Sequence, residues 1–175
     1  IGDLVDHLYD MGLLDDALII ILADHGVAFK EHGIFGHAYD ILYNEVLHVP
    51  LLMCGIEERG KIERFVELLD VSPTILDLCG IRKPRTFLGD SLLRSNTEKP
   101  IFSETAEPDL INLTYDTSRI AISCIANGWK IIVNQMREIM ELYDLRNDFD
   151  ERHNLIESRE DVKNILLNMI KEHLK

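Results

Sequence analysis

The sequence has few basic residues and no long apolar run. Lys and Arg number 18 against 31 Asp and Glu, which gives a formal net charge of −13 at pH 7. Because surfaces that bind nucleic acid or anionic lipid need clustered Lys and Arg, this deficit argues against both kinds of partner. No apolar run reaches the ~20 residues of a membrane span, and no secretory leader pattern occurs. We therefore expect no membrane partner and favour a cytoplasmic location. Because the sequence opens at Ile1 without a methionine, we expect the true N-terminus to lie upstream.

Cysteine is also scarce. The three cysteines are odd in number and widely spaced, so the sequence predicts no disulfide framework. Each lies among apolar neighbours, which is typical of buried free thiols. They are Cys54, Cys79 and Cys124. With 175 residues, 46% of them hydrophobic, the chain can bury one core and a small second lobe.

The first half of the chain alternates helical and strand patterns, which is typical of an α/β fold. Residues 2–11 have apolar positions at helical spacing and end at Gly12, so we expect an amphipathic helix that packs on a sheet. Residues 18–23 are an apolar run without helical spacing, which predicts a strand buried on both faces of a parallel sheet. Residues 49–55 predict a second core strand.

A helix is predicted over residues 70–80, with Ser72 as its N-cap, Pro73 at its first position and Gly80 as its stop. An irregular connection follows, and residues 101–104 predict a short strand. We expect a boundary between residues 105 and 118, which divides the chain into a core portion, residues 1–110, and a small C-terminal subdomain, residues 111–175.

The C-terminal subdomain is predicted to be a small antiparallel sheet followed by a helix. Its strands are expected over residues 119–126, 129–134 and 138–143. Asn127-Gly128 between the first two is a strong hairpin signal. The last segment predicts a helix capped by Ser158 that reaches the C-terminus, with one apolar face formed by Val162, Ile165, Leu166 and Met169.

Asp24 and His25 directly follow the first predicted strand. In open α/β sheets, reactive groups collect beyond the carboxyl ends of such strands. A carboxylate and an imidazole suit zinc, manganese or iron better than a pure-oxygen calcium site. The alternative is an Asp that caps a turn beside a histidine bonded to backbone. The residues alone leave both possibilities open.

Two more histidines, His32 and His37, lie in a polar loop punctuated by Gly33 and Gly36. Functional groups are often found on such loops. Either imidazole could bind a second metal, hold an anionic substrate or protonate a leaving group. We therefore name His37 and His32 as candidate catalytic residues.

A serine hydrolase is an alternative hypothesis for this sequence. Gly89-Asp90-Ser91-Leu92 and the Asp150 to His153 segment match two blocks of the G-D-S-L esterases in the right order. In those enzymes, however, the nucleophile follows an early strand, whereas Ser91 lies late in a polar connection. This hypothesis also leaves Asp24 and His25 without a role.

The order of the motifs resembles the sulfatase family of the alkaline-phosphatase-like superfamily along nearly the whole chain. The segments that carry the resemblance are residues 14–26, 31–33, 36–37, 42–52, 71–81, 89–92, 127–130 and 141–155. The resemblance implies part of an alkaline-phosphatase-like core sheet with flanking helices, followed by the small antiparallel sheet and the C-terminal helix. It also assigns both esterase-like blocks to structural elements.

The resemblance further implies a hydrolase of sulfate or phosphate esters. Its divalent metal, for which calcium, manganese and zinc are not distinguished, is held partly by Asp24 and His25, and His37 and His32 assist the leaving group. Many sulfatases have Asn at the position of His25 and a Lys near that of His37. These departures leave the metal, and the choice between sulfate and phosphate, open.

The family's nucleophile block, C/S-x-P/A-x-R, does not occur in the sequence. The chain therefore resembles only the C-terminal part of a sulfatase. Formylglycine is expected only in the missing N-terminal half, and we expect the chain alone to be inactive. The alternatives are a phosphate or phosphonate ester hydrolase of the same superfamily, and a noncatalytic remnant that forms homo-oligomers through an exposed sheet edge.

Overall fold

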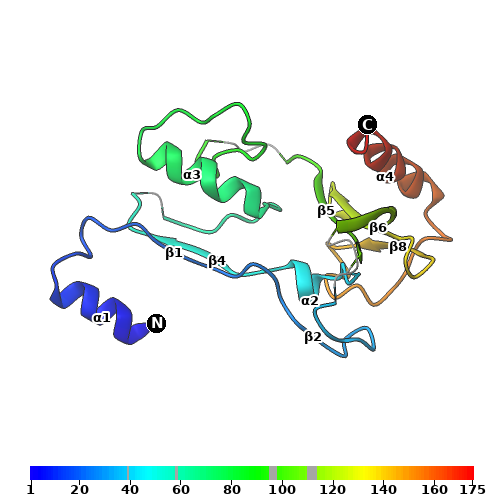
Figure 1. The fold of residues 1–175 in the computed structure, drawn as a ribbon, viewed down its shortest axis with the longest axis horizontal. Coiled ribbons are helices and arrows are strands. Elements are labelled where there is room, and N and C mark those ends of the chain that lie inside the picture. Colours follow the sequence, from blue (N-terminus) through cyan, green and yellow to red (C-terminus); the bar gives the residue numbers. More distant parts are fainter. Residues whose placement is uncertain (39, 58, 95–97, 110–113) are drawn as a thin grey trace.

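The computed structural model describes residues 1–38, 40–57, 59–94, 98–109 and 114–175. Figure 1 shows α1 and the β1–β4 pair toward one end of the molecule and the sheet that carries α4 toward the other. The elements are α1 (Gly2–Asp10), β1 (Ile19–Leu22), β2 (Ala28–Phe29), β3 (Phe35–Gly36), α2 (Asn44–Leu47), β4 (Leu51–Cys54), η1 (Leu68–Asp70), α3 (Val71–Leu78), β5 (Ile101–Asp109), β6 (Thr114–Ala126), β7 (Trp129–Asn134), β8 (Ile139–Asp144) and α4 (Glu160–His173).

The two predicted core strands form β1 and β4, but they pair antiparallel, with Leu22 opposite Leu51. The prediction of a parallel, doubly buried strand is therefore wrong for β1. Leu22 is 42% exposed and Leu52 is 52% exposed. Within the described residues these strands pair only with each other, so no third strand shields their backbone edges.

The predicted N-terminal helix is confirmed as α1. Gly12 has a φ of +67°, and its N–H donates to the Tyr9 carbonyl at 2.9 Å, which ends the helix as expected. No residue of α1 is buried, and Tyr9 is 70% exposed. The expectation that this helix packs on the sheet is therefore wrong. Self-association through the exposed edge stays a prediction.

The helix predicted over residues 70–80 is α3, and Gly80 ends it with a φ of +67°. Its N-cap is Asp70, so the prediction that Ser72 caps the helix is wrong. Asp70 is the last residue of η1, whose own start has a reciprocal capping box between Glu67 and Asp70. That preceding turn supplies the helix start, so Val71 is the first helical residue and the prediction that Pro73 holds this position is also wrong.

The C-terminal sheet has the order β5-β6-β7-β8 and is antiparallel throughout. Asn127 and Gly128 both have positive φ, +53° and +76°, so the predicted hairpin turn is confirmed. β5 is longer than the predicted strand and pairs with β6 across the expected boundary, whose residues 110–113 lie outside the described ranges. The division into residues 1–110 and 111–175 stays a prediction.

Helix α4 covers one face of this sheet (Figure 1). Leu166 and Ile170 are buried in a cluster with Ile122, Ile131 and Leu142 of the strands. The predicted apolar face is confirmed except for Ile165, which is 54% exposed. The helix starts after Arg159, so Ser158 is not its N-cap; the Ser158 hydroxyl donates to the Leu155 carbonyl instead.

The prediction of buried thiols is confirmed for Cys124 alone, because Cys54 and Cys79 are exposed. Burial raises the pKa of Cys124 to about 12. Among the described residues, no helix combines the length and apolar character that a membrane crossing requires.

Candidate functional site

Asp24 and His25 lie in the turn that follows β1. The His25 N–H donates to Asp24 Oδ1 at 2.9 Å, as expected for an Asp that closes a turn. His25 Nδ1 lies 2.9 Å from the Gly26 carbonyl oxygen. Because a carbonyl only accepts, Nδ1 is the donor in this contact, so Nε2 is the nitrogen through which a neutral ring would bind a ligand. The two possibilities that the sequence left open, a turn and a ligand pair, are thus compatible in one geometry.

The pair fits part of a metal site. His25 Nε2 lies 3.8 Å from Asp24 Oδ2, and the Asp24 side chain is 88% exposed. Two ligand atoms at about 2.1 Å from one ion lie at most about 4.2 Å apart, so this separation is suitable. A backbone carbonyl on the other ring nitrogen is also usual for a ligating histidine. Within the described ranges, however, no three His, Cys, Asp or Glu side chains gather to hold a metal ion.

His37 is brought next to this pair by the β2–β3 hairpin. Its ring stacks on that of His25, with centroids 4.5 Å apart and an interplanar angle of 28°. His37 directly follows β3, and Gly36 before it has a φ of +105°. Both histidines are exposed, so a bound molecule could reach them. The fold therefore assembles three of the four predicted site residues, Asp24, His25 and His37.

The fourth, His32, is held by contacts inside the protein. Its Nδ1 lies 2.7 Å from Glu45 Oε1, and its Nε2 lies 2.8 Å from the Glu151 carbonyl oxygen. Its ring stacks on Tyr43 at 3.8 Å. Both partners are acceptors, so both nitrogens carry protons. This geometry leaves no lone pair for a metal and favours a structural role.

The pKa of His32 agrees with that protonation. Burial by itself lowers the pKa, but the hydrogen bonds to the Glu151 carbonyl and the Glu45 carboxylate outweigh it. The pKa of His32 therefore lies above its ordinary value of 6.5. The ring is an imidazolium over more of the neutral range than a free histidine.

Sequence reasoning missed a fully buried ion pair beside His32. Lys130 Nζ lies 2.6 Å from Glu151 Oε1, and neither side chain is exposed. Burial lowers the pKa of Lys130 and raises that of Glu151, and the attraction between the two opposes both shifts. A lysine within the apolar run of β7 was the available signal, because a strand buried on both faces seldom contains an unpaired charge.

The esterase-like serine has a structural environment. The Ser91 hydroxyl donates to Asp77 Oδ2 of α3 at 2.7 Å, and the Leu92 N–H donates to Thr74 Oγ1 at 2.9 Å. His153, the other half of the esterase hypothesis, is an exposed residue 3.6 Å from Asp148. Since the Ser91 hydroxyl donates its hydrogen bond to a carboxylate on α3, these contacts hold the segment around Ser91 against the helix and do not activate a nucleophile.

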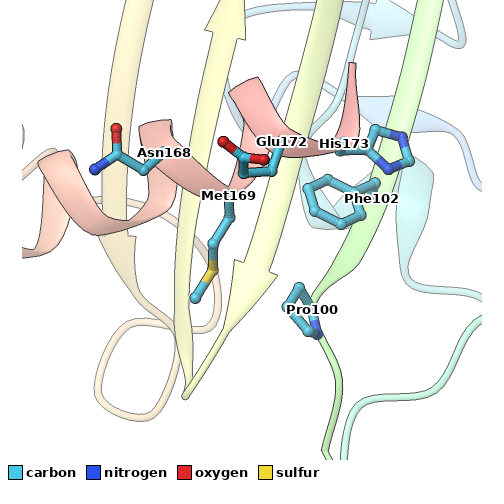
Figure 2. Close-up of a pocket in the computed structure, with 6 residues that line it drawn as sticks. All are labelled: Pro100, Phe102, Asn168, Met169, Glu172 and His173. Carbon is cyan, nitrogen blue, oxygen red and sulfur yellow. The ribbon is translucent and has the colours of Figure 1, made fainter. Parts of the chain in front are cut away.

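A shallow cavity of about 480 Å³ lies between β5 and α4 (Figure 2). The His173 ring stacks on Phe102 at 3.9 Å, and its Nε2 lies 3.2 Å from Glu104 Oε1. The lining residues are Pro100, Phe102, Asn168, Met169, Glu172 and His173. None of the predicted site residues is among them.

Comparisons with known proteins agree with the sequence-based resemblance. Residues 30–175 match the family model described as N-sulphoglucosamine sulphohydrolase, C-terminal. The chain is 31% identical to arylsulfatase K of Bos taurus over 166 residues and 31% identical to that of Homo sapiens over 172 residues. Each match covers 89% of this chain and 30% of the relative. The chain thus spans about 30% of the length of these curated relatives.

Solved structures confirm the predicted α/β fold of the sulfatase type. A 2-O GAG sulfatase superposes with a TM-score of 0.84 at 20% identity, over 99% of this chain and 39% of that chain. A phosphonate monoester hydrolase from Silicibacter pomeroyi gives a TM-score of 0.77 at 23% identity, over 99% of this chain and 37% of that chain. At these identities the likeness concerns the fold alone.

Proposed function

This chain belongs to the N-sulphoglucosamine sulphohydrolase C-terminal family of the sulfatases, and on that premise we propose that it serves as the C-terminal part of a metal-dependent sulfuric ester hydrolase. The observation that carries the proposal is the grouping of Asp24, His25 and His37 beyond β1, with His25 Nδ1 directed at the Gly26 carbonyl and Nε2 left for a ligand. Because the relatives are about three times longer, the activity is assigned to a longer protein that contains this segment.

In that protein, Asp24 and His25 would supply two ligands of one divalent cation. The Gly26 carbonyl accepts from Nδ1 of His25, so Nε2 would be the ring nitrogen that binds such a cation. A bound divalent cation would neutralise charge on the ester oxygens. Sulfatases generally use a divalent metal and formylglycine. We place the nucleophile and the remaining ligands in the N-terminal part that the longer relatives contain.

His37 is the candidate acid. Its exposed ring, stacked on His25, lies where it can donate a hydrogen bond to an ester oxygen or a proton to the leaving group. His32 was predicted to share this role, but its two nitrogens already face Glu45 and the Glu151 carbonyl. We therefore assign the acid to His37 and a supporting role to His32.

A second candidate is hydrolysis of phosphate or phosphonate esters. It is favoured by the histidine at position 25, where many sulfatases have Asn, and by the fold shared with a phosphonate monoester hydrolase. Both reactions require an anionic ester beside a cation, so the site residues would be the same.

The test uses the longer protein and measures kcat and KM for an aryl sulfate and the matching aryl phosphate, together with bound metal per chain. We expect the sulfate to be preferred. His25→Ala should lower the metal content, and His37→Ala should lower kcat by about 10²–10⁴-fold with the metal retained. His7→Ala, an exposed histidine of α1, is the matched control.

Preference for the phosphate would favour the second candidate. Full metal content and full activity in His25→Ala would refute the site. The 175-residue chain alone should turn over neither ester.

A further inference from the structure

Both segments that carry the candidate site lie against α2. The Gly26 N–H donates to the Val46 carbonyl at 2.7 Å. A Cβ at Gly26 would lie 2.2 Å from the Glu45 carbonyl oxygen, closer than any real contact. The turn that contains Asp24 and His25 therefore touches the backbone of α2, and only glycine permits that approach.

The hairpin that carries His37 reaches the same helix through other contacts. Ala28 of β2 is fully buried in the core cluster that also contains Val46. His32, in the turn of the hairpin, pairs with Glu45 at 2.7 Å. A displacement of α2 would consequently move both sides of the His25–His37 stack.

Helix α2 is a single turn of four residues, so its position depends on its partners and not on its own stability. The Asn44 N–H donates to Glu151 Oε2 at 2.5 Å, and Asn44 Nδ2 donates to the Phe149 carbonyl at 2.9 Å. Lys130 Nζ donates to Asn44 Oδ1 at 2.9 Å. The C-terminal sheet and the turn after β8 thus hold the first residue of α2 at three atoms.

We infer that Lys130 and Glu151 are positioning residues, whose buried pair fixes α2 through Asn44 and thereby sets the placement of Asp24 and His25 against His37. Their importance for turnover rests on the proposed function, but the positioning itself does not. The C-terminal sheet, in which no predicted site residue lies, therefore determines the geometry of the site.

The test compares imidazole signals of the isotope-labelled chain by ¹H–¹³C NMR, at one pH and without added metal or ester. Lys130→Met and Asn44→Ala should both shift the His25 and His37 ring signals, because the stack changes, and should leave those of His7 in place. Asn44→Ala keeps the Lys130–Glu151 pair, so any shift in this variant comes from the altered hold on α2 and not from loss of the buried charge pair. It also provides the test if Lys130→Met does not fold.

Leu166→Ala is the matched control. Leu166 is buried between α4 and the sheet, so this variant weakens the same C-terminal unit without a contact to α2. It should lower the melting temperature and leave the His25 and His37 signals unmoved. Unmoved signals in a folded Asn44→Ala variant, or equal shifts in Leu166→Ala, would overturn the inference. Because no metal is present, failure of the His25→Ala metal test bears on the proposed function alone.

Discussion

Replacement of Lys130 by methionine removes the cation of a fully buried pair and keeps most of the side-chain volume. The Lys130 ammonium is 2.6 Å from Glu151 Oε1 and 2.9 Å from Asn44 Oδ1. Loss of one partner leaves the other charge buried and unpaired, which costs about 3–5 kcal/mol. The free energy of unfolding should fall by that amount, which is a large share of the ~5–15 kcal/mol typical of a domain.

The size of this loss should depend on pH. Burial raises the pKa of Glu151 above its ordinary value of 4.5, and the nearby ammonium opposes the rise. Without Lys130 the pKa rises further, so the folded variant binds the proton more tightly than the unfolded chain. That stabilisation is complete below the ordinary pKa and is lost as the pH rises through the folded value. The deficit of Lys130→Met should therefore be larger at pH 8 than at pH 5.

Urea unfolding followed by circular dichroism at pH 5 and pH 8 measures the loss of unfolding free energy in Lys130→Met. Glu151→Gln and the double variant Lys130→Met/Glu151→Gln complete a cycle, in which the double variant should lose less than the sum of the singles. Lys61→Met is the control, because the exposed Lys61–Glu63 pair should contribute at most about 1 kcal/mol. A loss in Lys130→Met below about 1 kcal/mol at pH 8 would refute the reasoning.

Two further predictions concern the residues around α2. The pKa of His32 is raised in the folded protein, so the stabilisation from its protonated ring is complete below about pH 6.5 and is lost as the pH rises through the folded pKa. Melting temperatures measured over pH 5–9 should therefore fall more steeply in the wild type than in His32→Phe, and parallel profiles would contradict this. Gly26→Ala should lower the free energy of unfolding in urea by about 1–3 kcal/mol, because the new Cβ meets the Glu45 carbonyl. Gly2→Ala, with open space around it, should change this free energy little, and equal effects of the two variants would contradict the close approach at Gly26.

Features that depend on a few neighbouring residues could be predicted. Gly12 and Gly80 end their helices with positive φ, and the Asn127-Gly128 turn joins two strands as predicted, with Ala126 opposite Trp129. The start of α3 was missed, because its cap comes from a preceding turn whose capping box has no apolar pattern to reveal it. The direction of β1 against β4 was also missed, since an apolar run specifies burial and not the partner strand.

The sequence by itself determined the chemical types at the candidate site, because Asp24 and His25 are adjacent and follow a strand directly. It did not determine which histidines would join them. His37 stacks on His25, whereas His32 is bonded to the carbonyl of a residue 119 positions away. Only the tertiary structure separates these two roles, because a histidine's function depends on the acceptors that the fold places at each ring nitrogen.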